Sequence, residues 1–72
     1  MSEPLGPALR LAAEPGRWQV TLVGGDTIQL LAHGYSIEAD EYVFSLLVDG
    51  TPPFEVDAAR LPRSLVREVE GG

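Results

Sequence analysis

The chain has 72 residues, enough for one small domain, and its hydrophobic fraction of 44% is typical of a folded protein rather than a disordered one. It carries a net charge of −6 and has no cysteine, which excludes disulfides, thiolate nucleophiles and thiolate metal sites. No apolar run is long enough to cross a bilayer, and the first residues do not resemble a signal peptide. These features predict a cytoplasmic protein.

The charges are unevenly distributed along the chain. Arg17 and Arg60 bracket a stretch that contains no lysine or arginine. The acids within it are Asp26, Glu38, Asp40, Glu41, Asp49, Glu55 and Asp57. Nucleic-acid binding requires cations that displace counterions from phosphates, so this stretch argues against direct contact with DNA, RNA or an anionic membrane. It favours a partner protein with a basic surface.

The first 16 residues are rich in proline and glycine and predict an N-terminal arm. Residues 7–13 can form one or two helical turns that begin at Pro7, or can lie as a loose segment on the domain. We expect the folded domain over residues 17–70 and a flexible tail at residues 71–72.

Two strands joined by a tight turn are predicted after the arm. Residues 18–22 alternate large apolar and polar side chains, the period of a half-buried strand, and residues 27–30 resume this alternation. Gly24 and Gly25 between them permit the positive φ of a hairpin turn. The predicted core face of the hairpin consists of Trp18, Val20, Leu22, Ile28 and Leu30.

Three further strands are predicted, over residues 35–40, 42–48 and 54–58. The first alternates, with Tyr35, Ile37 and Ala39 on one face. Residues 42–48 are apolar on both faces and rich in aromatic and β-branched residues, which indicates a central strand. A helical stripe also runs through this region, but it contains a charge, so we favour strands.

The segment Leu61-Pro62-Arg63-Ser64-Leu65-Val66 resembles the last signature of SH3 domains, in which an aliphatic residue and a proline lead into a 3₁₀ turn and the final strand. The resemblance implies an all-β fold: a small five- to six-stranded antiparallel barrel with a short 3₁₀ turn before the last strand. Closure would also protect the strand edges of so small a sheet. The aromatic residue with which SH3 domains hold proline-rich peptides is replaced by Leu65, so no peptide groove is implied.

Few residues are suited to covalent chemistry. His33 is the only histidine, and next to a glycine bend it is best interpreted as a turn residue. A small hydrolase or metal-dependent enzyme would require His33 to meet at least two acids in a pocket. The acids Glu38, Asp40 and Glu41 lack the spacing of a calcium loop and fit a solvated strand and turn, with Glu41 pointing away from the other two. We therefore expect no catalytic residue, no metal and no cofactor.

The sequence favours a non-enzymatic acidic module or regulator that binds another protein. Tryptophan and tyrosine dominate interface hot spots, and clustered acids attract basic surfaces. The candidate binding residues are Trp18, Tyr35, Glu38, Asp40 and Glu41. A free edge strand also leaves open a homodimer.

The alternative is a ubiquitin-like or sulfur-carrier protein that acts through Gly71 and Gly72. Such carriers end in a slim Gly-Gly that enters the narrow channel of an activating enzyme, and the absence of lysine would prevent self-conjugation. Proteins of this kind have a helix between the second and third strands, which we do not expect in this chain.

Overall fold

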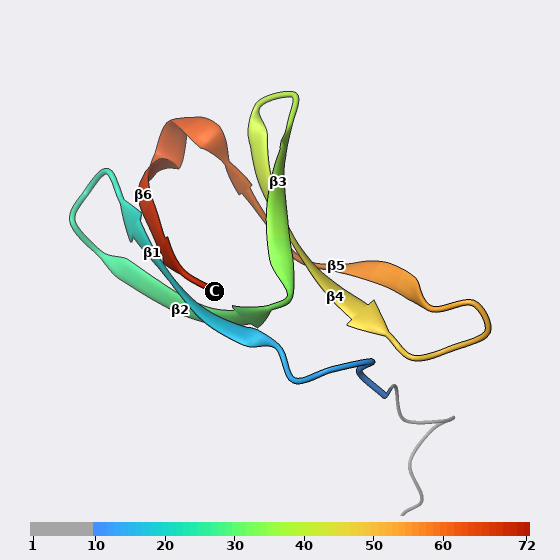
Figure 1. Cartoon of the computed structure of the whole chain (residues 1–72). Helices are drawn as coiled ribbons and strands as arrows, with labels where there is room; N and C mark the ends of the chain where they lie inside the picture. Colours follow the sequence, from blue (N-terminus) through green and yellow to red (C-terminus); the bar gives the residue numbers. More distant parts are fainter. Residues whose placement is uncertain (1–9) are drawn as a thin grey trace, which may run out of the picture.

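Residues 10–72 form six antiparallel strands and one 3₁₀ helix (Figure 1). A computed structural model describes residues 10–72. The elements are β1 (Gly16–Leu22), β2 (Thr27–Ala32), β3 (Gly34–Glu38), β4 (Glu41–Val48), β5 (Phe54–Pro62), η1 (Arg63–Leu65) and β6 (Val66–Gly71). The all-β prediction, the number of strands and the 3₁₀ turn before the last strand are confirmed.

The predicted β1–β2 hairpin is present, with Trp18 opposite Leu30 and Val20 opposite Ile28. Its turn is closed by two backbone hydrogen bonds: the Gly25 amide donates to the Leu22 carbonyl over 2.9 Å, and the Leu22 amide donates to the Asp26 carbonyl over 2.8 Å. Gly25 has a φ of 96°, the left-handed conformation for which the sequence supplies glycine.

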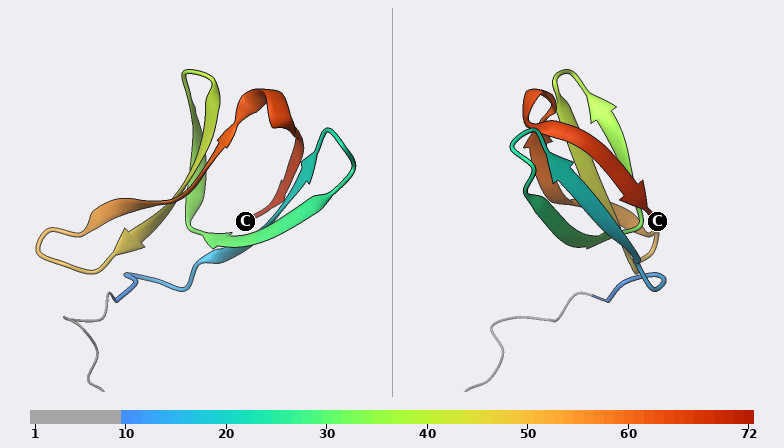
Figure 2. Two further views of the ribbon diagram at one scale, coloured as in Figure 1. Left: turned by 180° about the vertical axis from the view of Figure 1, so that it is seen from behind. Right: turned by 90° about the vertical axis from the view of Figure 1, so that its left-hand side faces the viewer.

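The six strands are divided between two three-stranded sheets, in the orders β2-β1-β6 and β3-β4-β5. The chain passes between the sheets twice (Figure 2): through His33, the single residue between β2 and β3, and through η1 between β5 and β6. Within the described part of the chain, β3 and β6 each pair on one side only, with β4 and β1 respectively. The sheets therefore do not join into one continuous ladder along these two edges.

The hydrophobic core lies between the two sheets. Val20, Ala32 and Phe44 are fully buried there, one from each of β1, β2 and β4. The partly buried residues packed against them are Trp18, Leu22, Ile28, Leu30, Tyr42, Ala59, Leu61, Val66 and Val69. The predicted core face of the first hairpin thus packs as the alternation indicated.

Strand β4 is central in its sheet and buried on both faces, as its sequence predicted. Phe44 enters the core, while its neighbour Val43 is on the opposite face and is only 3% exposed. Val43 lies in register between Ser36 of β3 and Arg60 of β5, so its burial comes from side chains on the outer face of the sheet.

The far end of the β4–β5 hairpin projects beyond the core, and the described part of the arm lies along it (Figures 1 and 2). Leu11 forms an antiparallel bridge with Val48, flanked by hydrogen bonds from Ala12 to Leu47 and from Asp49 to Arg10. This contact covers the edge of β4 beyond the end of β3 and leaves Val48 only 2% exposed. The first residues of the predicted helical segment lie outside the described residues.

Candidate functional site: the β3–β4 hairpin

Four aromatic rings gather where β1 meets the β3–β4 hairpin. Tyr35 contacts Trp18 edge to face, with ring centroids 5.3 Å apart and an interplanar angle of 85°. It also lies 5.3 Å from Phe44 and 5.8 Å from Tyr42. Trp18 is held in place by its indole N–H, which donates to the Ala32 carbonyl over 2.9 Å. Tyr35 is therefore the outermost member of a cluster rooted in the core.

Two side chains of β3 face the core side yet remain uncovered. Tyr35 is opposite Phe44 in the register and Ile37 is opposite Tyr42, so both share the face that packs inward. Nevertheless, Tyr35 is 41% exposed and Ile37 is 49% exposed. Because β3 is an edge strand, no second strand from residues 10–72 lies beside it to shield them. We call Tyr35 and Ile37 the apolar edge.

The predicted acids flank the turn of the same hairpin. Glu38 and Glu41 are directly paired, with Ala39 and Asp40 forming the two-residue turn between them. Directly opposed residues share a face, so the expectation that Glu41 points away from Glu38 is wrong: the turn reverses the chain between them. The Ser36 hydroxyl donates to the Glu38 carboxylate over 3.1 Å.

The structure thus brings the five predicted residues to one region. Tyr35, Glu38, Asp40 and Glu41 belong to the hairpin, and Trp18 reaches it from β1 through its contact with Tyr35. Sequence reasoning missed Ile37 as a site residue because alternation placed it on one face of its strand with Tyr35 but did not show that this face would be exposed.

Arg60 alters the predicted charge of this face. The sequence predicted that the acidic stretch would be free of cations. In the structure, the antiparallel pairing of β5 with β4 places Arg60 beside these acids. Its guanidinium lies 3.0 Å from Glu41, 3.0 Å from Asp57 and 4.0 Å from Glu38. The hydrogen bond to Asp57, followed by that to Glu41, raises the pKa of Arg60 above its usual value. The face is acidic with one neutralising arginine at its centre.

Replacing Arg60 with glutamine is expected to lower the melting temperature, because three carboxylates would then repel one another above Val43. This decrease in melting temperature should become smaller as salt is added, because the charged groups are exposed and are screened by ions. Thermal melts at low and high ionic strength would measure it. The control is Arg63→Gln, which removes the same charge from an exposed residue of η1. Equal losses in both variants would contradict the role given to Arg60.

His33 is a structural residue at the corner between the sheets. Its Nδ1 accepts a hydrogen bond from the Leu47 amide over 2.8 Å, and its Nε2 lies 2.8 Å from the Ala13 carbonyl oxygen. Because Nδ1 accepts a hydrogen bond, the imidazole must carry its proton on Nε2, and this N–H donates to the Ala13 carbonyl oxygen. Both ring nitrogens are engaged by backbone groups, so the geometry gives no support to a role for His33 as a catalytic base.

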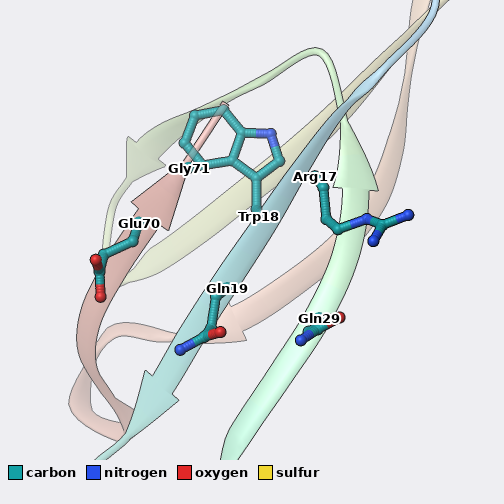
Figure 3. Close-up of a pocket in the computed structure, with 6 residues that line it drawn as sticks. All are labelled: Arg17, Trp18, Gln19, Gln29, Glu70 and Gly71. Carbon is teal, nitrogen blue, oxygen red and sulfur yellow. The ribbon is translucent and has the colours of Figure 1, made fainter.

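A shallow hollow of about 330 Å³ lies beside Trp18 (Figure 3). Figure 3 shows the amides of Gln19 and Gln29 side by side on one face of the sheet, while the Trp18 ring points to the opposite side. The remaining lining residues are Arg17, Glu70 and Gly71. These groups offer hydrogen bonds but no nucleophile paired with a base.

The glycines of the carrier alternative lie against the fold. Gly71 belongs to β6 and is paired with Trp18, and the Gly72 amide donates to the Arg17 carbonyl over 3.3 Å. A side chain at Gly72 would meet the Trp18 ring at about 3.0 Å. Only His33 separates β2 from β3, which leaves no room for the helix that the alternative requires.

Over residues 10–72, no group of three or more histidines or acids is arranged to hold a metal ion. In the same part of the chain, no helix has the length and apolar character needed to cross a membrane. No protein-family model, curated protein or solved structure matches the chain. The site must therefore be interpreted from its own geometry.

Proposed function

We propose that this protein is a non-enzymatic interaction module that binds a basic partner protein through its β3–β4 hairpin. The observation that carries the proposal is the apolar edge: Tyr35 and Ile37 are about half exposed on the core-facing side of an edge strand. Exposed aromatic and aliphatic side chains above a rigid base are typical of interface anchors.

The charge of the hairpin supports the choice of partner. Glu38, Asp40 and Glu41 adjoin the apolar edge, and the side chains of Glu38 and Glu41 remain 57% and 41% exposed despite their contacts with Arg60. Glu38 and Glu41 lie on the outer face of the hairpin and the apolar edge lies on its inner face. The acidic face steers a basic surface toward the hairpin and disfavours acidic competitors. The net charge of −6 also favours a basic partner.

The proposed scaffold is an SH3-like small barrel. The support lies in the strand orders β2-β1-β6 and β3-β4-β5, the single-residue bend at His33, and the 3₁₀ turn that follows Pro62. In this arrangement the apolar edge lies on β3, which among the described residues pairs on one side only, with β4.

The test is affinity purification from the native cell with the wild-type chain and two charge variants as baits. We expect a basic protein to be retained at low salt, released at high salt, and to bind again when purified. The variant Glu38→Gln/Glu41→Gln should weaken binding by about tenfold, because it removes two of the acidic charges of the hairpin.

The matched control is Glu14→Gln/Asp26→Asn, which changes the net charge equally at exposed residues outside the hairpin. It should leave most of the affinity intact. If both charge variants weaken binding equally, the net charge of the chain and not the hairpin is responsible, and the proposed site is wrong.

A further inference from the structure

We infer that β3 binds its partner by strand addition: an extended segment with alternating apolar and basic side chains pairs with the free edge of β3. This mode of binding rests on the proposed function and specifies the chemistry of the partner. Three features of the hairpin carry it: the backbone groups of the edge, the side chains on its inner face and the charges on its outer face.

Among residues 10–72, no strand pairs with the outer backbone edge of β3. In an antiparallel ladder the pair beside a two-residue turn is the closely spaced, hydrogen-bonded one, and the pairs alternate from there. Glu38↔Glu41 and Ser36↔Val43 are therefore the hydrogen-bonded pairs. The N–H and C=O groups of Tyr35 and Ile37 consequently point away from β4, toward the unpaired edge.

Another edge in the same sheet is covered by the chain itself. Beyond the end of β3, the edge of β4 is covered by Arg10–Ala12 through two backbone hydrogen bonds. The corresponding apolar residue there, Val48, is only 2% exposed, whereas Ile37 on the uncovered edge is 49% exposed. A strand at the β3 edge would provide the same cover that the arm provides for β4.

The side chains specify an alternating partner. Residues of an added strand that share the inner face would lie beside Tyr35 and Ile37, at the usual cross-strand distance of about 4.5–5.5 Å, and would need to be apolar to cover them. Residues on the outer face would lie beside Ser36 and Glu38, with Glu41 next to them in the register. Lysine or arginine at these positions gives complementary charge.

A second copy of the chain is a poorer occupant of this edge. Each copy carries a net charge of −6, and β3 itself contains Glu38 but no lysine or arginine. Two β3 edges placed together would therefore bring two acidic faces into contact, because in each copy the single charge of Arg60 is already shared among Glu38, Glu41 and Asp57.

The test uses an octapeptide of alternating lysine and valine, blocked at both ends, and a control peptide with the same composition arranged in Lys-Lys-Val-Val blocks. Binding is measured by the fluorescence of Trp18, the only tryptophan, which contacts Tyr35. We expect the alternating peptide to bind at least about fivefold more tightly, because only it presents one apolar and one basic face to a strand edge.

Two further measurements separate strand addition from simple charge attraction. The amides of Tyr35 and Ile37 should gain protection from hydrogen exchange when the alternating peptide is bound. N-methylation of one alternate set of peptide amides should abolish binding, while methylation of the other set should be tolerated, because only one set faces β3.

The outcomes distinguish this inference from the function on which it rests. If both peptides bind equally and Glu38→Gln/Glu41→Gln weakens both, the acidic site stands and strand addition is overturned. If neither peptide binds at low salt, strand addition is also overturned. If the basic partner from the native cell binds the variant as tightly as the wild type, the proposed function itself fails.

Discussion

Replacement of Phe44 with alanine is expected to lower the free energy of unfolding by about 3–5 kcal/mol. Phe44 is fully buried between Val20 and Ala32, and its ring lies 6.0 Å from that of Trp18. Truncation would leave a cavity at the point where the two sheets meet. A chain of this size has a total stability of only about 4–11 kcal/mol, so the variant should be largely unfolded or close to it.

Urea denaturation followed by circular dichroism and Trp18 fluorescence would measure this loss. Phe54→Ala is the matched control, because it makes the same chemical change at a ring that is 49% exposed, and it should cost less than about 1 kcal/mol. Phe44→Leu keeps most of the volume and should remain folded, with a loss of about 1–1.5 kcal/mol. Similar losses for Phe44→Ala and Phe54→Ala would contradict the assigned core.

His33→Ala should have the second largest effect, a loss of about 1–3 kcal/mol, because it leaves the Leu47 amide and the Ala13 carbonyl without their partner. Through these two hydrogen bonds the imidazole joins the arm to β4 at the corner between the sheets. We expect residues 10–13 to detach from β4 and the Leu47 amide to exchange much faster with solvent. Amide hydrogen exchange measured by NMR would report this residue by residue.

Two conservative variants separate the two hydrogen bonds of His33. Asparagine places an oxygen near the position of Nδ1, so His33→Asn should preserve the bond from the Leu47 amide. Glutamine places a nitrogen near the position of Nε2, so His33→Gln should preserve the bond to Ala13. If the Leu47 amide exchanges equally slowly in the wild type and in His33→Ala, the histidine does not hold this corner.

The elements of the fold were predictable because their signals are local. Alternation assigned Trp18, Val20 and Leu22 to a core face, and the two-sided apolar run around Phe44 identified the central strand. The glycine turn and the proline before η1 fix backbone geometry within a few residues. Each of these features depends only on neighbouring positions in the sequence.

The features that escaped prediction depend on register and on backbone groups. Arg60 reaches Glu41 only because β5 pairs with β4 in a particular register that includes a bulge. The role of His33 depends on a backbone amide and a backbone carbonyl, groups that every residue except proline possesses, so no sequence pattern marks them. Ile37 is exposed because, among the described residues, no second strand lies beside β3. Alternation indicates only which face of a strand a residue occupies, and not whether that face is covered.

The glycines of the fold also set limits on how far this sequence can diverge. A methyl group at Gly71 would collide with the Arg17 carbonyl, and one at Gly16 would lie 2.6 Å from the backbone of Gly72. By contrast, a methyl group at Gly24 or Gly34 would meet nothing within 4 Å. Descendants of a common ancestor should therefore keep glycine at positions 16 and 71 while positions 24 and 34 drift. That contrast offers a way to recognise distant relatives whose overall similarity has faded.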